Sequence, residues 1–376
     1  MGDDTPRGDA QPTPDEAAGT RGAPTTARPG SLPRHRPHRH HRGVVIGVVL
    51  LSIGLVVGIV TSVTPWPSAM LIRAVFEQGG TATAAEMQQY VPKNGVEART
   101  DIEYGDAGAD TSLDVFTPAS DTGATTDATP RATIVWIHGG AWISGQKENV
   151  DPYLRILASH GYAAIGLNYT VAPEAVYPTA VTQLNDALGF ITEHAEEWGV
   201  DPDRIILAGD SAGAQLASQL AVLTTNPQYA HLIGIEPRLE PKQLIATILN
   251  CGVFDLQRMA DLNGIEAWGF KVALWGYTGT KDWSSTYAGS TMSTIDFVTA
   301  DFPPTYISGG NGDALTWIES VPMSSRLQQA GVDVTELFWS ANHEPKLPHE
   351  YQFHLDLPDA QTALNETLAF LERIAG

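Results

Sequence analysis

Two short motifs about seventy residues apart contain residue types suited to acyl-transfer chemistry. Gly209-Asp-Ser-Ala-Gly213 places a serine between two glycines, directly after the apolar run at 204–208. His138-Gly-Gly-Ala-Trp142 follows a second apolar run at 132–137. A serine in a sharp turn between a strand and a helix is an accessible nucleophile, and glycine-rich loops supply backbone N–H groups for the negative charge that its attack creates. The pair of motifs predicts a serine hydrolase.

Within these motifs, Ser211 is the predicted nucleophile. Gly209 and Gly213 are expected because a side chain at either position would clash in so sharp a turn. The backbone N–H groups of Gly139, Gly140 and Ala212 are the expected oxyanion donors. The alternative is an ordinary strand-to-helix turn with Ser211 as a helix N-cap.

A serine nucleophile needs a general base, and the base needs a carboxylate to orient it. In G-x-S-x-G hydrolases the acid follows the serine in the chain and the histidine comes last. Asp313 lies in a glycine-rich loop after the apparent strand 305–308 and is the expected acid, with a helix N-cap as its alternative role. His343 and His349 both follow the last predicted strand, 333–339, and both are candidates for the base.

We expect mainly structural roles for the other residues of the glycine loop and for the single cysteine. We expect the His138 ring to brace its loop, and Trp142 either lines an acyl pocket or packs under the loop. The prolines between His343 and His349 preclude the helical H-E-x-x-H zinc motif and no third ligand is evident, so no metal is predicted. Cys251 is the only cysteine, which excludes an intramolecular disulfide, and it is expected to be a small buried residue.

The pattern of apolar residues predicts an α/β fold with a mostly parallel sheet and helices on both faces. Strand-like and helix-like segments alternate after residue 132, and a segment rich in Trp, Met and Gly at 252–301 interrupts them. This segment is expected to be an insertion over the carboxyl ends of the strands. The expected strands are 97–104, 112–116, 132–137, 163–168, 204–208, 245–250, 305–308 and 333–339, and the expected helices are 180–198, one from the serine motif to about 223, and 360–374.

Charge is distributed unevenly along the 376 residues, whose formal net charge is −21. Residues 1–42 carry seven arginines and five acidic residues, so the remainder carries a net charge of −23. An acidic body of this kind argues against nucleic acid and anionic lipid headgroups as partners, and it disfavours anionic substrates.

The N-terminal part has the composition of a tail followed by a membrane-spanning helix. Residues 1–33 are rich in Pro, Gly, Thr and Asp, which predicts disorder. The basic cluster 34–42 precedes 21 uncharged residues, 43–63, a length that spans a bilayer. Basic residues before the span predict a cytoplasmic N-terminus and an outward-facing body. A cleaved signal peptide is the alternative, with Pro67-Ser-Ala69 as a weak cleavage site.

A helix at 67–88 with one apolar stripe is expected to follow the span and to pack on the catalytic domain, or else to lie on the membrane surface. The predicted organisation is a disordered cytoplasmic tail at 1–42, a signal-anchor helix at 43–63, a linker and cap helix at 64–95 and a catalytic domain at 96–376.

Four segments together resemble the hormone-sensitive-lipase-like carboxylesterases of the α/β-hydrolase superfamily over residues 95–374. The segments are His138-Gly-Gly-Ala-Trp142, Asn168-Tyr-Thr-Val-Ala-Pro-Glu174, Asp201-Pro-Asp-Arg-Ile205 and Gly209-Asp-Ser-Ala-Gly213. The resemblance implies Ser211 as nucleophile, Asp313 as acid, the amides of Gly139, Gly140 and Ala212 as donors, an N-terminal cap and no cofactor.

The sequence departs from this family at the histidine, which the family usually follows with Gly-Phe. His349-Glu-Tyr-Gln-Phe353 has a comparable aromatic pattern, whereas His343 is followed by Glu-Pro but has the more usual distance from Asp313. We therefore predict His349 as the base.

The prediction is a membrane-anchored, outward-facing carboxylic-ester hydrolase of uncharged, short-to-medium acyl esters. An amidase or peptidase, an acyltransferase, and a catalytically silent adhesion or scaffold module are the alternatives.

Overall fold

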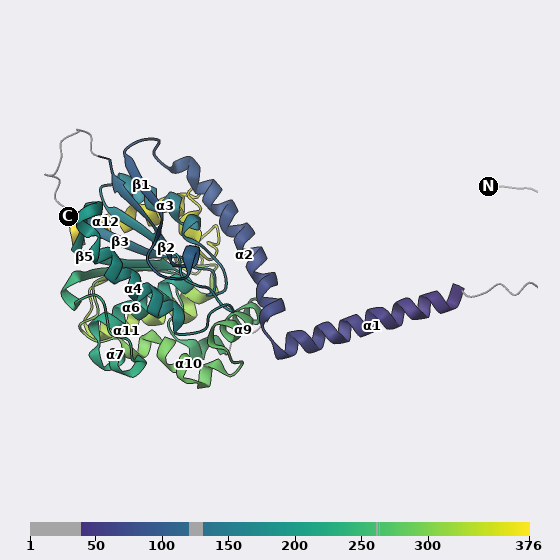
Figure 1. Cartoon of the computed structure of the whole chain (residues 1–376). Helices are drawn as coiled ribbons and strands as arrows, with labels where there is room; N and C mark the ends of the chain where they lie inside the picture. The colour runs from purple at the N-terminus through teal and green to yellow at the C-terminus, as the bar shows by residue number, and fades with distance from the viewer. Residues whose placement is uncertain (1–38, 120–130, 261, 263) are drawn as a thin grey trace, which may run out of the picture. The chain divides into compact units, whose positions relative to one another are not determined.

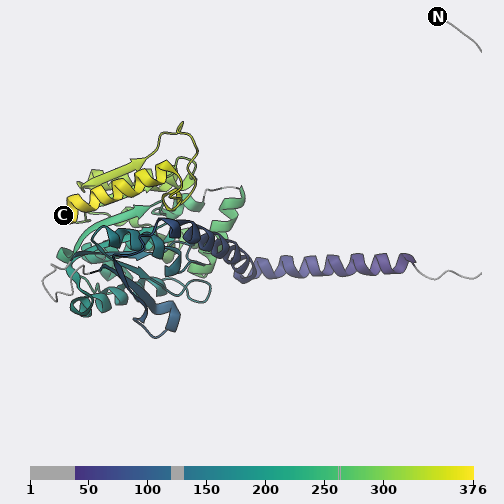
Figure 2. The same cartoon turned by 90° about the horizontal axis from the view of Figure 1, so that it is seen from above.

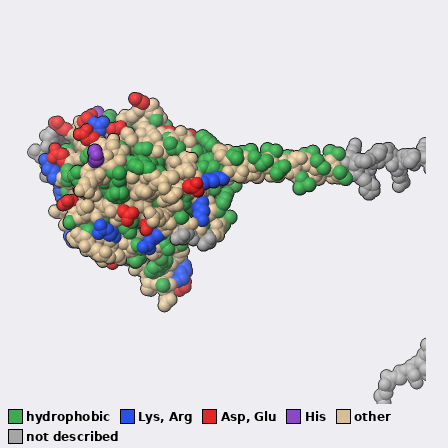
Figure 3. Space-filling model, turned by 90° about the horizontal axis from the view of Figure 1, so that it is seen from below, with side chains coloured by type: hydrophobic (Ala, Val, Ile, Leu, Met, Phe, Trp, Pro, Cys, Tyr) green, Lys and Arg blue, Asp and Glu red, His purple; other side chains and the backbone are tan. Residues whose placement is uncertain are grey.

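The computed structural model describes residues 39–119, 131–260, 262 and 264–376, and these described residues divide into two compact units with the boundary between Leu55 and Val56. The predicted disordered tail and most of the basic cluster before the apolar span lie outside the described residues. The first helix, α1 (Arg39–Val63), contains the whole predicted span. It is the only helix among the described residues that is long and apolar enough to cross a membrane. Figure 3 shows it covered by apolar side chains and backbone, in keeping with the absence of charge from Gly43 to Val63.

A single eight-stranded sheet is the framework of the second unit. Its order is β1-β2-β4-β3-β5-β6-β7-β8, in which β2 is antiparallel to both neighbours and the six strands from β4 to β8 are parallel. Figure 2 shows the two edges, with β8 and the last helix in yellow on one side and the N-terminal strands in blue on the other. The strands are β1 (Val96–Glu103), β2 (Ser112–Pro118), β3 (Arg131–Ile137), β4 (Ala163–Leu167), β5 (Val200–Asp210), β6 (Leu244–Asn250), β7 (Thr305–Gly309) and β8 (Val334–Phe338).

Helices cover both faces of this sheet, as the sequence predicts (Figure 1). On the central strand β3, Val135 and Ile137 face one apolar core while Ile134 and Trp136 face the other, because successive side chains of a strand point to opposite faces. Helices α4, α6 and α11 contribute to the first core and α3 and α12 to the second. Their bounds are α3 (Asp151–Ser159), α4 (Thr179–Glu193), α6 (Ala212–Thr225), α11 (Val321–Ala330) and α12 (Pro358–Ala375).

Three further groups of helices complete the unit. The predicted cap helix is α2 (Trp66–Met87), and it contacts α9 of the insertion as well as α3. The insertion expected at 252–301 consists of α8 (Leu256–Ala260), α9 (Gly264–Thr278) and α10 (Tyr287–Met292). Two short helices, α5 (Ala195–Trp198) and α7 (Pro227–Ile233), follow α4 and α6. The fold therefore leaves the carboxyl ends of β3, β5, β7 and β8 as the place where the motif residues meet.

Candidate active site

The turn between β5 and α6 holds Ser211 in a conformation that non-glycine residues rarely adopt. Its φ is 52° and its ψ is −120°, and its side chain does not cap the helix. An added Cβ at Gly209 would lie 2.5 Å from the backbone of Gly213, and one at Gly213 would lie 2.0 Å from the carbonyl oxygen of Ile137. Gly209 is therefore required by the sharp turn, as expected, and Gly213 by the close approach of α6 to the end of β3. Strained backbone of this kind persists where a site holds a reactive side chain in place.

A hydrogen-bonded chain links three of the predicted site residues. The Oγ of Ser211 lies 2.9 Å from Nε2 of His349, and Nδ1 of His349 lies 2.7 Å from Oδ2 of Asp313. Because a carboxylate can only accept, Nδ1 carries the proton and Nε2 of the neutral ring is free to accept from the serine hydroxyl. Asp313 also accepts the N–H of Leu315 through Oδ1 at 2.9 Å. The capping alternative and the orienting role therefore use different oxygens of the same carboxylate.

Asn311, which the sequence analysis did not single out, holds the loop that carries the histidine. Its side-chain amide donates to the carbonyl of His343 at 2.8 Å, and its Oδ1 accepts the N–H of Leu347 at 2.9 Å. The N–H of Gly312 in turn donates to the carbonyl of Leu347 at 2.9 Å. These bonds join the Asp313 loop to the His349 loop. No motif in the sequence marks Asn311, because the partners of its side chain lie 29 to 36 residues away.

His343, the other candidate base, lies away from Ser211 in its contacts. Its Nε2 is 3.1 Å from Oδ1 of Asp359 on α12, and its ring is 4.4 Å from that of Trp339. The structure thus brings His349, and not His343, to the serine.

The amide of Gly139 does not serve as predicted, since it is already paired. Its N–H donates to Oδ2 of Asp210 at 2.8 Å, so it is not available to an oxyanion. Gly140 and Ala141 follow with φ values of 103° and 52°, and among the described residues no hydrogen bond is formed by either N–H. Ala212, the first residue of α6, has no intrahelical acceptor for its N–H. The donors available beside Ser211 are therefore Gly140, Ala141 and Ala212.

A pair of carboxyl groups lies against this loop. Asp210 is buried, and it accepts hydrogen bonds from Trp136 Nε1 at 2.7 Å and from Gly139. Burial raises the pKa of Asp210 well above its usual range, and the neighbouring Glu350 carboxylate raises it further. Glu350 also lies 3.7 Å from His349 Nε2 and has a φ of 58°. Sequence reasoning missed this pair, because the two residues are 140 positions apart and meet only in the fold.

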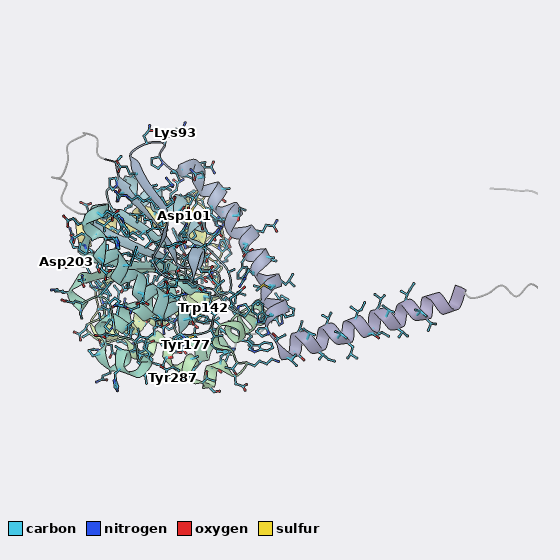
Figure 4. The ribbon with its side chains drawn as sticks, in the orientation of Figure 1. Lys93, Asp101, Trp142, Tyr177, Asp203 and Tyr287 are labelled. Atoms are coloured by element: carbon cyan, nitrogen blue, oxygen red, sulfur yellow. The ribbon has the colours of Figure 1, made fainter. Side chains whose placement is uncertain are left out.

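The remaining residues of the glycine loop are structural. His138 Nδ1 donates to the carbonyl of Gly139 at 2.8 Å, its ring stacks on Tyr169, and burial lowers its pKa to about 4. Trp142 is fully buried, and its indole stacks on Tyr277 and donates to Gln215 at 3.1 Å. Figure 4 labels Trp142 together with Tyr177, which also packs on Tyr277. His138 therefore braces the loop, and of the two expectations for Trp142 the structure supports packing beneath it.

The groups around His349 shift its pKa in opposite directions. Burial lowers the pKa of His349, but Cys251 and the Asp313 carboxylate beside it raise the pKa, and the net direction is well above the usual value. Burial raises the pKa of the Cys251 thiol, which is consistent with a small buried residue. Cys251, Asp313 and His349 bring one potential metal-ligand atom each to within 4.8 Å of one another, but Nδ1 of His349 and Oδ2 of Asp313 already bond to each other. The contacts of this cluster therefore favour the serine–histidine–aspartate arrangement over a metal centre.

A cavity of about 370 Å³ opens at Ser211 and His349. Besides the turn at Ser211 and the residues before α3, its walls come from α2, the glycine loop, α9 and the His349 loop. Apolar walls are provided by Val75 and Phe76 on α2, Phe270 on α9 and Phe353. The cap helix and the insertion thus both reach the site, as the sequence predicts for a fold that binds ligands at the carboxyl ends of its strands.

The family model BD-FAE matches residues 113–327, which is more than half of the chain and includes the serine, the acid and the glycine loop. The chain belongs to the BD-FAE family. The resemblance to the hormone-sensitive-lipase-like carboxylesterases is confirmed at the level of the family by this match and by curated relatives that are esterases. The match ends before residue 349, so it does not bear on the choice of histidine.

Two curated relatives illustrate the similarity. The probable carboxylic ester hydrolase LipM of Mycobacterium tuberculosis is 32% identical over 169 residues, and an acetyl esterase of Salmonella choleraesuis is 32% identical over 130 residues. The matched segments cover 43% and 34% of this chain. They span only 36% and 37% of the relatives' own lengths.

Solved structures match over more of the chain and confirm the α/β-hydrolase fold. Esterase B from Lactobacillus rhamnosus has a TM-score of 0.69 at 22% identity, with 82% of this chain and 95% of that chain covered. A bacterial heroin esterase has a TM-score of 0.62 at 26% identity, with 81% and 91% covered. The predicted fold class is therefore correct.

Proposed function

We propose that this protein is a carboxylic-ester hydrolase in which Ser211 is the nucleophile, His349 the general base and Asp313 its orienting acid. The observation that carries the proposal is the chain of hydrogen bonds from Asp313 through His349 to Ser211, at 2.7 and 2.9 Å, at the mouth of an apolar cavity. The family membership and the esterase relatives support the same chemistry.

The reaction has two halves. Ser211 Oγ attacks the ester carbonyl while His349 Nε2 takes the hydroxyl proton, and the resulting oxyanion is held by the N–H groups of Gly140, Ala141 and Ala212. His349 then gives that proton to the leaving alkoxide, which departs as the alcohol and leaves an acyl-serine. A water molecule, deprotonated by the same nitrogen, attacks the acyl-serine. The carboxylic acid leaves and the serine recovers its proton, so no cofactor is required.

The substrate class follows from the walls of the cavity. Phe76, Phe270 and Phe353 offer an apolar surface, and no lysine or arginine is among the described residues that line it. The Glu350 carboxylate lies at the same wall, and the body as a whole is acidic. These features support uncharged esters and oppose anionic ones.

We further propose that residues 43–63 anchor the protein in a membrane with the catalytic unit outside. A helix of 21 residues at 1.5 Å per residue reaches about 31 Å, the thickness of a bilayer core. Cleavage after the weak site Pro67-Ser-Ala69 would cut inside α2, where Ala69 is fully buried and donates its N–H to Pro65 at 2.8 Å. Protease added to intact cells should release the body, and a mature form beginning near Met70 would contradict the anchor.

The enzymatic proposal is tested with the purified full chain in detergent and matched ester and amide substrates with the same acyl group. Wild type is expected to hydrolyse the acetate or butyrate ester of an aryl alcohol and to be far slower on the amide. Ser211→Ala should lower turnover by about 10⁴-fold or more, as removal of a triad serine does elsewhere. Equal rates for wild type and Ser211→Ala would overturn the proposal. Preference for an alcohol over water as acceptor would replace it with an acyltransferase.

A further inference from the structure

A second, wholly apolar cavity of about 380 Å³ adjoins the catalytic one. The two share four lining residues, Val75, Phe76, Ala141 and Phe270, so the second cavity extends the site along the groove between α2 and α9. Its other lining residues are Leu71, Ile72, Ile265, Trp268 and Gly269. No charged or polar side chain is among the described residues that line this groove.

The outer edge of the groove is exposed to an extent that is unusual for large apolar side chains. Leu71 is 64% exposed, Ile265 is 80% exposed and Trp268 is 44% exposed. Val75 and Phe76 on α2 extend the same stripe toward the serine. We call Leu71, Val75, Phe76, Ile265 and Trp268 the apolar rim. A contiguous apolar rim beside a cavity marks a surface that contacts another apolar phase.

The apolar rim is not the face through which α2 packs on the body, because α2 is fastened to the body through its other side. The guanidinium of Arg73 donates to the carbonyls of Ile143 at 2.6 Å and Ala172 at 2.7 Å, and it pairs with Glu174 at 2.6 Å. Ala69 on the same helix is fully buried. Helix α2 is thus held in place with its apolar stripe facing outward.

The position of the apolar rim in the chain indicates which apolar phase it meets. The apolar span ends at Val63, and α2 begins three residues later at Trp66, an exposed aromatic residue of the type enriched at membrane interfaces. Beyond the end of α9, the ammonium group of Lys281 donates to the carbonyl of Ser62 and lies 4.3 Å above the ring of Trp275. In Figure 1, α9 lies at the N-terminal end of α2. Both walls of the groove therefore start at the end of the span.

We infer that the apolar rim contacts the outer surface of the bilayer that holds the anchor, and that the groove leads acyl chains of membrane-resident esters from the lipid to Ser211. The substrate class is an uncharged lipid ester, such as an acylglycerol, whose chain remains partly in the groove while its carbonyl reaches the serine. The acidic charge of the body favours a membrane surface of neutral headgroups over an anionic one. This inference rests on the proposed esterase activity and membrane anchor.

The test compares two substrates on the full-length protein in phosphatidylcholine nanodiscs, where both sides of the bilayer are accessible. One substrate is diacylglycerol within the disc, and the other is a water-soluble aryl acetate. The double variant Leu71→Gln/Ile265→Gln removes two exposed aliphatic side chains. Transfer of one such side chain to an apolar phase corresponds to a factor of about ten or more in an equilibrium. The ratio of the diacylglycerol rate to the acetate rate should therefore fall by at least about ten-fold.

Val176→Gln/Leu232→Gln is the matched control, since both residues are exposed aliphatic side chains outside the groove. The control should keep the wild-type ratio. An unchanged ratio in the Leu71→Gln/Ile265→Gln variant, or an equal fall in the control, would overturn the inference. Wild type that hydrolyses the acetate but not diacylglycerol would also overturn it and leave the proposed esterase intact. Wild type that hydrolyses neither would contradict the esterase itself.

A binding readout locates the surface without catalysis. An environment-sensitive fluorophore is attached to the cysteine of Ile265→Cys or of Leu232→Cys, and its emission is compared in two samples: protein in nanodiscs, and protein in detergent-free buffer with an amphipathic polymer around the anchor. The emission from position 265 should shift to the blue in nanodiscs. The emission from position 232 should not shift. The single native cysteine, Cys251, is buried and is expected to remain unlabelled. Identical spectra for the two positions would contradict membrane contact. A dimer that is lost in the Leu71→Gln/Ile265→Gln variant would instead identify the apolar rim as an interface between copies of the chain.

Discussion

The serine end of the sheet and the outward face of α2 and α9 differ in the polarity and exposure of their side chains. Around Ser211, Asp210 and Asp313 are buried and His349 is partly buried. These side chains are fixed by hydrogen bonds, as the pairing of Asp313 with both His349 and Leu315 illustrates. The apolar rim is exposed, and the residues that line its groove offer no polar side chain. The first region has the rigid geometry that bond cleavage requires. The second has no group among its described residues that could take part in catalysis, so it can affect only which substrates bind. Substitutions around Ser211 are therefore expected to lower the rate of ester cleavage, and substitutions in the apolar rim to change which substrates are cleaved.

The sharpest separation within the catalytic region is between its two histidines. His349→Ala should lower turnover of a soluble aryl ester by about 10⁴-fold, because it removes the base that contacts Ser211. His343→Ala should change turnover by no more than about three-fold, because that ring pairs with Asp359 at the far side of its loop. Steady-state kinetics of both variants, with circular dichroism as the check on folding, makes the comparison. Inactive His343→Ala with active His349→Ala would move the base and contradict the site.

The attachment of α2 to the body is tested by a pair of arginine variants. Arg73→Ala removes the guanidinium that holds α2 to two backbone carbonyls and to Glu174, and it should lower the free energy of unfolding by about 1–3 kcal/mol. Arg238→Ala breaks an exposed pair with Asp186 and should cost about 0–1 kcal/mol. Urea denaturation of the full chain in detergent measures both. Equal losses would show that Arg73 does not fasten α2 to the body.

The pH profile gives the smallest effect in the series. General-base catalysis needs neutral His349, so activity falls as the pH drops through its pKa, and a raised pKa places the acid limb of kcat/KM above pH 6.5. Glu350→Gln removes a negative charge 3.7 Å from Nε2, which stabilises the imidazolium, so the limb should move to lower pH. Glu344→Gln, an exposed carboxylate on the same loop, is the matched control. A limb that stays in place in Glu350→Gln, or moves upward, would contradict the assigned electrostatics.

Much of the catalytic region could be predicted from the sequence, because its signals are local. The turn at Ser211 is encoded by glycines two residues to either side, and the parallel sheet by short apolar runs that alternate with helical segments. The start of β5 at Val200 was not predicted, because its first residues pair with Arg131 and Ala132 across an Asp-Pro-Asp sequence that contains no apolar run. Helices α3 and α11 were also not predicted.

The parts that could not be predicted depend on partners that are distant in the chain. Asp210 accepts a hydrogen bond from the N–H of Gly139, so this expected donor is not available to an oxyanion. The N–H of Ala141 is unpaired among the described residues and can donate in its place. The contact of Asp210 with Glu350 and the role of Asn311 likewise appear only when separate loops meet. The groove is the same kind of feature. The sequence predicts an apolar stripe on the cap helix, but only the fold sets it beside Ile265 and Trp268.

Labelling by a fluorophosphonate is the most direct test that Ser211 is an activated nucleophile. The full-length protein in detergent is treated with the reagent, digested, and mapped by mass spectrometry, while hydrolysis of an aryl butyrate is followed in the same sample. We expect one phosphonylated serine, Ser211, loss of turnover in proportion to its labelling, and no labelling of Ser211 in His349→Ala on the same timescale. Folded protein that retains turnover after full labelling of Ser211, or that leaves Ser211 unmodified while turnover is lost, would contradict this expectation.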